Sequence, residues 1–169
     1  NTGGQASKST PMGAVAKFAS SGKRTSKKDL GLIAMAYGYV YVASVSMGSN
    51  KQHVLNAMKE AEAYNGPSII IAYSPCIAHG YDLRNSQAHG GNAVSSGYWP
   101  LFRFNPLATE KKLTWDSRPV SMDFKEFLLS ETRYKSLKTL NPSQADGLFA
   151  KAEKERREHL AFLEKLSEI

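Results

Sequence analysis

The chain has 169 residues, 41% of them hydrophobic, which is enough to bury a core and argues against global disorder. No apolar run approaches the roughly 20 residues needed to span a bilayer, so we expect a cytoplasmic protein with no membrane contact. The single cysteine, Cys76, excludes an internal disulfide and any metal site built from several thiolates of this chain.

The net charge of +7 is unevenly distributed. Residues 1–28, called the arm below, contain six Lys and Arg side chains and no Asp or Glu, so the remaining residues carry a charge of only +1. Such an arm is typical of proteins that bind nucleic acid or another polyanion, but a solvated loop has the same composition. Phe18 is its only aromatic residue, which leaves no platform for stacking bases, and we therefore disfavour a nucleic-acid partner.

The arm is rich in Gly, Ser, Thr and Lys without a sustained period, which predicts a loosely held loop with at most one helical turn near residues 12–19. Apolar residues then recur at helical spacing over residues 30–37. Ser26 is a candidate N-cap for this helix, with Asp29 as its acidic partner, and Gly38 is a candidate left-handed C-cap.

The next segments predict a sheet. Residues 39–45 are β-branched and aromatic, as in a strand, and residues 50–64 form an amphipathic pattern after a capping box at residues 49–52. Residues 68–73 are a continuous apolar run of the kind found in strands buried on both faces. The order helix, strand, helix, strand with short connections predicts an α/β fold with a parallel sheet flanked by helices, where ligands gather at the carboxyl ends of the strands.

Beyond the second strand the pattern is weaker. Residues 77–97 predict a glycine-containing loop. The aromatic run at residues 98–104 predicts a packing segment, and residues 107–120 predict irregular chain. Helical patterns return over residues 124–137 and after Asn141-Pro142, so we expect a helical C-terminal extension. The predicted domains are residues 1–106 and residues 107–169.

The chain begins with Asn1-Thr2-Gly3-Gly4-Gln5, in which small residues let the backbone approach a ligand closely. Further distinctive strings lie at residues 14–18, 27–30, 37–42, 66–68, 71–77 and 96–104. In combination these strings resemble the pyruvate:ferredoxin (flavodoxin) oxidoreductases, large enzymes of anaerobic metabolism. The first string is similar to the turn that closes the thiamine-diphosphate motif of that family, and the resemblance is strongest over residues 1–106.

The resemblance implies the C-terminal part of the thiamine-diphosphate-binding domain, in a fragment that begins inside its own cofactor site. The implied reaction of the full-length enzyme is oxidative decarboxylation of pyruvate with coenzyme A to acetyl-CoA and CO₂, with electrons passing to ferredoxin or flavodoxin. The implied cofactors are thiamine diphosphate, Mg²⁺ and [4Fe–4S] clusters. The implied partners are the rest of the polypeptide and a second copy in a homodimer, and the fragment alone is expected to be inactive.

The same resemblance assigns roles at the start of the chain. It places Asn1 beside the reactive ring of the thiamine and the substrate, where the side-chain amide donates to an oxygen on which charge develops. Asn1 would therefore be both a catalytic and a cofactor-binding residue. It makes Thr2 and Gly3 part of the cofactor pocket. Without the resemblance, this string would be an ordinary turn.

Cys76 is the other assigned residue. The resemblance makes it one of the four cysteine ligands of the [4Fe–4S] cluster nearest the thiamine, the other three belonging to an upstream segment. The competing interpretation is a buried, inert cysteine. His79 could tune the cluster by hydrogen bonding. His53 and His159 are expected at the surface, and His89 in the loop.

Two other functions remain open from the residues alone. The arm allows a basic nucleic-acid-binding module, which a binding titration over a salt series would reveal. The fold also allows a non-catalytic interaction domain that has kept the architecture and lost the chemistry. A Gly-Asp-Gly motif upstream in the gene would favour the enzyme.

Overall fold

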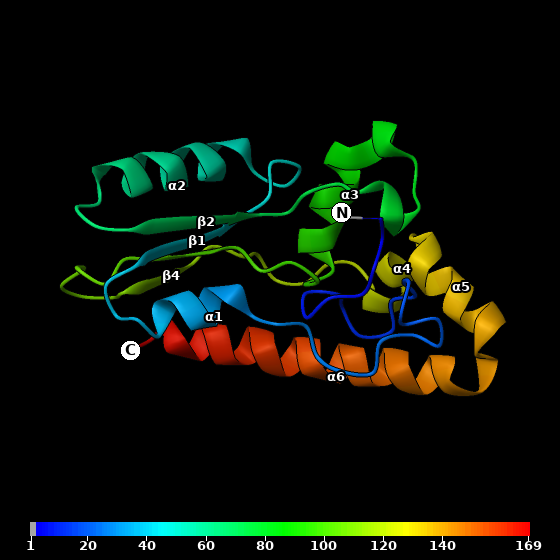
Figure 1. Ribbon diagram of the computed structural model, residues 1–169. Helices are drawn as coiled ribbons and strands as arrows, with labels where there is room; N and C mark the ends of the chain where they lie inside the picture. The colour runs from blue at the N-terminus through cyan, green and yellow to red at the C-terminus, as the bar shows by residue number, and fades with distance from the viewer. Residues whose placement is uncertain (1–2) are drawn as a thin grey trace.

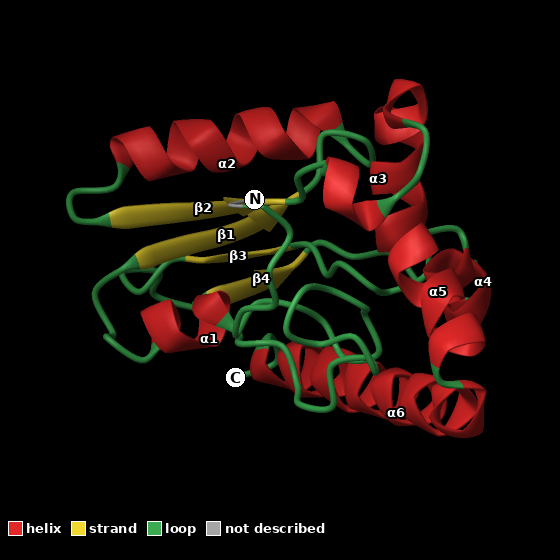
Figure 2. Cartoon of the chain, turned by 45° about the vertical axis from the view of Figure 1, so that its right-hand side comes forward, coloured by secondary structure: helices red, strands yellow, loops and turns green. Residues whose placement is uncertain are grey.

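The computed structural model describes residues 3–169 as a four-stranded sheet with helices on both faces and at one end (Figures 1 and 2). The strands lie in the order β2-β1-β3-β4 and are β1 (Tyr41–Val45), β2 (Ser68–Ala72), β3 (Phe102–Phe104) and β4 (Leu113–Trp115). The helices are α1 (Leu30–Met35), α2 (Lys51–Ala63), α3 (Ser86–Ser95), α4 (Phe124–Leu129), α5 (Thr132–Leu140) and α6 (Pro142–Leu166), with short 3-10 turns η1 (Ile77–His79) and η2 (Leu83–Asn85).

The two strands predicted from sequence are parallel neighbours. β1 pairs with β2 from Tyr41 opposite Ser68 to Val45 opposite Ala72, and α2 connects them, which confirms the predicted α/β class. The sheet is nevertheless mixed, because β3 runs antiparallel to β1 and β4 antiparallel to β3. The β3–β4 pairing crosses the predicted division after residue 106, and that division stays a prediction.

β1, and not β2, is the strand that is buried on both faces. All five β1 residues are buried, whereas β2 lies at the edge of the described sheet with half-buried and exposed residues. Alternate β1 side chains point to opposite faces. Tyr41, Ala43 and Val45 pack against α2, while Val42 packs with α1 and α6 on the other face. The prediction that residues 68–73 are buried on both faces is therefore wrong for the described residues.

A third cluster of buried side chains fills one end of the molecule. It includes Phe127, Tyr134, Leu137 and Phe149, from α4, α5 and α6, together with Ala14 from the arm. β1 and β2 both run towards this end, where α3, α4 and α5 lie (Figure 2). The helices α3 to α5 thus cover the carboxyl edge of the parallel pair.

Several local predictions differ from the structure. Residues 77–97, predicted as a loop, contain η1, η2 and α3. The helix predicted over residues 124–137 is broken between α4 and α5, and β4 lies in chain predicted to be irregular. The N-cap of α1 is Asp29 and not Ser26, because the Asp29 carboxylate accepts from the backbone N–H of Leu32 at 2.8 Å. No helix among residues 3–169 is both long and apolar enough to cross a membrane.

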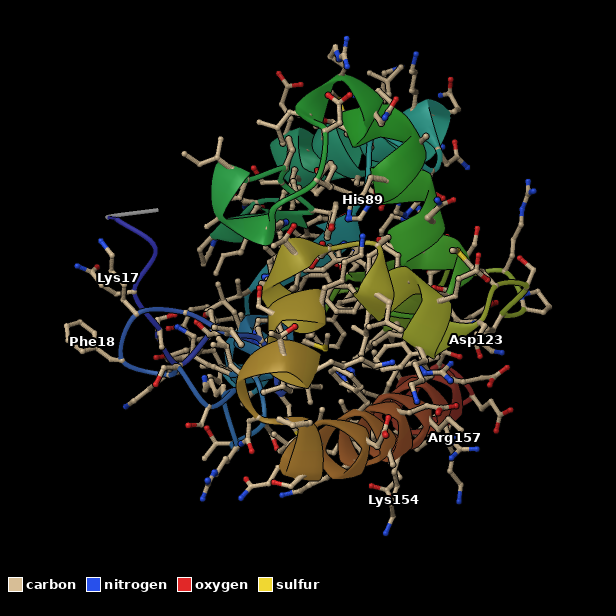
Figure 3. All side chains as sticks on the ribbon, turned by 90° about the vertical axis from the view of Figure 1, so that its right-hand side faces the viewer. Lys17, Phe18, His89, Asp123, Lys154 and Arg157 are labelled. Atoms are coloured by element: carbon tan, nitrogen blue, oxygen red, sulfur yellow. The ribbon has the colours of Figure 1, made fainter. Side chains whose placement is uncertain are left out.

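The arm is a loop, as predicted, and its described residues contain no helix, but its middle is anchored. Met12 and Ala14 are buried, and the backbone N–H of Val15 donates to the carbonyl of Arg133 at 2.8 Å. At the tip, Phe18 is 90% exposed with φ +66°, and its side chain points away from the body of the molecule (Figure 3). The prediction of a loosely held arm thus misses the contacts at its centre.

We expect hydrogen exchange to divide the arm in two. The amides of Gly13 and Val15 donate to backbone carbonyls beside buried side chains, so they should exchange at least about tenfold more slowly than the amide of Phe18 at the exposed tip. Mass spectrometry or NMR of the exchanging chain measures this. Equally fast exchange across residues 3–28 would show that the arm is not anchored.

Candidate functional site

Cys76 lies beyond the carboxyl end of β2, in the segment of residues 73–81 that we call the Cys76 loop. Its thiol is half-buried and caps η1, since Sγ accepts from the backbone N–H of Ala78 at 3.4 Å. The hydrophobic clusters found among residues 3–169 do not include it. The surroundings of the thiol therefore differ from the apolar core that an inert, buried cysteine would occupy.

The described residues fit a [4Fe–4S] cluster as one ligand of four. Nowhere in residues 3–169 do three or more His, Cys, Asp or Glu side chains gather in a way that could hold a metal ion. A partly accessible cysteine whose sulfur accepts a backbone N–H matches the environment of a cluster ligand, because such hydrogen bonds help to set cluster potentials. Completing a cluster on Cys76 would need thiolates from other segments.

The other predicted site residues lie at the start of the arm. Asn1 and Thr2 are outside the described residues. Gly3 has φ +92°, a backbone conformation that favours glycine. A Cβ at this position would meet only the ends of the Lys17 and Gln5 side chains, at 3.7 and 3.9 Å, so backbone conformation and not crowding calls for glycine here.

A buried carboxylate that the sequence did not single out, Glu131, lies against the Cys76 loop. Its Oε1 accepts from Nε2 of His89 at 2.8 Å and from the hydroxyl of Tyr73 at 3.4 Å. Its Oε2 accepts from Nε of Arg133 at 2.5 Å, and Nδ1 of His79 lies 3.6 Å from Oε1. Glu131 has no solvent exposure, so these groups supply the contacts that water would make.

The charge state of this cluster follows from its burial. Burial raises the pKa of Glu131, but the hydrogen bond from His89 and the charge of Arg133 lower it by more, so the pKa lies below its ordinary value. An ionised carboxylate only accepts, and His89 therefore donates through Nε2. Burial and the charge of Arg133 lower the pKa of His79 to about 4, which leaves it neutral at pH 7. Burial and Glu131 raise the pKa of Tyr73, whose hydroxyl remains a donor.

The other histidines also differ from their predicted places. His89 lies in α3 and not in a loop, and its side chain points into the space between α3 and the pair α4 and α5 (Figure 3). His53, predicted at the surface, is buried with Nε2 3.0 Å from Asp116. His159 is half-buried and lies 2.8 Å from Asp29. Their acidic partners are distant in sequence, so a local pattern of charged neighbours could not reveal them.

Part of the charge of the arm is used inside the molecule. Nζ of Lys27 lies 5.5 Å from the centre of the Trp99 ring, and burial lowers the pKa of this lysine. Lys27 lines a cavity of about 400 Å³ between the arm, α1, the sheet and α6, together with His159 and Arg156. Nζ of Lys23 donates to a backbone carbonyl of the arm itself. These contacts reduce the number of cations that a polyanion could reach.

Comparisons with known proteins find that the chain is similar to segments of several oxidoreductases. It is 53% identical to the pyruvate:ferredoxin oxidoreductase of Moorella thermoacetica and 49% identical to the pyruvate-flavodoxin oxidoreductase of Klebsiella pneumoniae, each over 99% of this chain. It is 49% identical, over 86% of its length, to the pyruvate dehydrogenase (NADP⁺) of Cryptosporidium parvum. No protein-family model matches the chain.

The chain spans only about 15% of the length of the first two relatives and 8% of the third. As one segment of such a sequence, it belongs to the family of the pyruvate:ferredoxin and pyruvate-flavodoxin oxidoreductases. The resemblance inferred from its short strings is confirmed.

We expect the stability of the chain to fall as the pH is lowered from 7 to 4. Unfolded His79 takes up a proton near pH 6.5 but folded His79 only near pH 4, so the unfolded state binds more protons in that window. The lowered pKa of Glu131 acts in the same direction below its unfolded value of 4.5. The contribution of both groups to the free energy of unfolding is thus fully present above pH 6.5 and is lost as the pH falls.

Urea unfolding at a series of pH values measures this effect. In His79→Gln the loss of stability between pH 6.5 and about 4.5 should be smaller than in the wild type, because glutamine takes up no proton in either state. If the free energy of unfolding falls equally with pH in the two proteins, His79 is not held neutral by burial.

Proposed function

We propose that this chain is one segment of an oxidoreductase that converts pyruvate and coenzyme A to acetyl-CoA and CO₂. The two electrons released pass through iron–sulfur clusters to ferredoxin or flavodoxin. The similarity over 99% of the chain carries this proposal, and the names of the relatives supply the substrate and the electron acceptors. Thiamine diphosphate with Mg²⁺, when bound, would supply the carbanion-stabilising chemistry.

The carboxyl edge of the sheet is where this chain would contribute to the site. The parallel pair β1 and β2 ends there and the Cys76 loop begins there, and ligands of open α/β sheets bind at that edge. The sequence holds one cysteine and a [4Fe–4S] cluster takes four thiolates, so three would come from other parts of the polypeptide. We therefore propose that the chain alone is inactive. From the resemblance to the family we also propose that the full-length protein works as a cytoplasmic homodimer.

Four residues receive roles in this proposal. Cys76 is a ligand of the [4Fe–4S] cluster, supported by its partly accessible thiol and its N–H···S contact. Asn1 donates its side-chain amide to an oxygen that gains charge during the reaction, and it also contacts the cofactor. Thr2 and Gly3 contact the cofactor, and the positive φ of Gly3 supports close backbone approach there.

In the full-length enzyme, Cys76→Ala should abolish electron transfer to ferredoxin while pyruvate and the cofactor still bind. The variant lacks one of four cluster ligands, so electron paramagnetic resonance of the reduced protein should show one [4Fe–4S] signal fewer. Ser74→Ala, at an exposed position of the same loop, is the control and should keep every signal. A full set of signals with normal ferredoxin reduction in Cys76→Ala would make Cys76 a packing residue.

Replacing Asn1 with Ala in the full-length enzyme should lower kcat roughly 10²–10³-fold, the usual cost of removing one donor to a developing charge. The affinity for thiamine diphosphate should change much less, because the cofactor keeps its metal and diphosphate contacts elsewhere. Steady-state kinetics and a cofactor titration measure the two effects separately. Turnover close to that of the wild type would reject the catalytic role.

A further inference from the structure

Two residues that flank Cys76 at equal spacing, Tyr73 and His79, lie beside the same carboxylate oxygen. The hydroxyl of Tyr73, before Cys76, donates to Oε1 of Glu131 at 3.4 Å. Nδ1 of His79, after Cys76, lies 3.6 Å from the same oxygen. The Glu131 side chain, just before α5, therefore forms a hydrogen bond to the loop on one side of the thiol and lies beside the His79 ring on the other.

The backbone of the loop is hydrogen-bonded to Thr132, which follows Glu131 and is the first residue of α5. The carbonyl of Gly80 accepts from the backbone N–H of Thr132 at 3.0 Å and from its hydroxyl at 2.5 Å. Gly80 has φ +76°, and a Cβ there would lie 2.5 Å from Cβ of Thr132. Only glycine permits so close an approach of loop and helix.

Arg133, which follows Glu131 and Thr132, contacts the arm. Its carbonyl accepts from the N–H of Val15 at 2.8 Å. Its mostly buried guanidinium donates to Glu131 and, through Nη2, to the hydroxyl of Tyr98 at 3.0 Å. Residues 131–133 thus bind both the Cys76 loop and the arm, the two segments that carry the proposed cofactor roles.

A carboxylate is an unusual choice for such a buried position. Pairing two buried charges often stabilises a fold no better than well-packed apolar side chains of similar volume. Glu131 instead fixes the orientation of its neighbours, because its two oxygens accept hydrogen bonds from Tyr73, His89 and Arg133. Glu131 precedes the first residue of α5, yet its side chain makes no capping hydrogen bond, so these interior contacts are what it serves.

We propose that Glu131 is a positioning residue that sets the geometry of the Cys76 loop and, with Arg133, holds that loop in a fixed relation to the arm. In this role Glu131 acts through the neighbours to which it is hydrogen-bonded. The effect of Glu131 on a cluster bound through Cys76 rests on the proposed function. The effect of Glu131 on the geometry of the loop is independent of that function.

Glu131→Gln tests the proposal, because it keeps the size of the side chain and removes the charge. The matched control is Glu60→Gln, since Glu60 is also a carboxylate paired with an arginine, Arg103, and with a tyrosine hydroxyl, on α2. Thr132→Val is a milder variant at an exposed position that removes only the hydroxyl bond to Gly80. It keeps the test decisive if Glu131→Gln does not fold.

The first measurement is hydrogen exchange of the chain. The amides of Ala78 and His79 donate to Sγ and to the carbonyl of Cys76, so their exchange reports the geometry of the loop. Relative to the amides of β1, they should exchange at least about fivefold faster in Glu131→Gln, with a smaller change in Thr132→Val and none in Glu60→Gln. A ratio that stays at its wild-type value in Glu131→Gln, or in Thr132→Val if the former does not fold, overturns the proposal.

The second measurement uses the full-length enzyme. The electron paramagnetic resonance spectrum and the midpoint potential of one [4Fe–4S] cluster should shift in Glu131→Gln with the cluster content unchanged, and should not shift in Glu60→Gln. If Cys76→Ala loses a cluster signal while Glu131→Gln leaves spectrum and potential unchanged, the positioning role is overturned and the ligand role stands. If Cys76→Ala keeps every signal, the ligand role fails and the exchange ratio decides the positioning role.

Discussion

The burial of one carboxylate constrains the whole carboxyl edge of the sheet. Glu131 has no contact with solvent, and a buried charge is tolerated only when its charge and its lone pairs are matched. Its partners come from separate elements: Tyr73 follows β2, His89 lies in α3, and Arg133 lies in α5. Because all three must reach the same carboxylate, a shift of any one element would leave a buried polar group without a partner.

A second polar network has the same effect on the other part of the sheet. Asp116, directly after β4, accepts two hydrogen bonds from Arg103 in β3, each 2.9 Å long, and lies 3.0 Å from His53 in α2. A bidentate pair of this kind is directional as well as strong. It explains how strands of three residues stay paired, since side chains add to the few backbone bonds that such short strands can make.

Local patterns predicted the elements whose cause is local. The amphipathic residues of α2, the β-branched run of β1, the left-handed Gly38 and Pro142 at the first position of α6 all act within a few residues of themselves. The predicted capping box placed the N-cap of α2 one residue too early, because the side chain of Asn50, and not that of Ser49, accepts from the backbone N–H of His53. β3 and β4 were missed because three residues are too few to show a period of two. Cys76 was found through the resemblance alone, since a single cysteine has no spacing to interpret.

The sequence by itself determined the family, the parallel pair of strands and the helices beside them, because periodicity and characteristic strings are properties of short segments. Only the tertiary structure decided that Glu131 meets Tyr73 across 58 positions and that His53 meets Asp116 across 63. A glutamate before a helix or a histidine among charged neighbours has the same local pattern whether it is exposed or buried. The packing of distant segments, which removes water from these side chains, selects their partners.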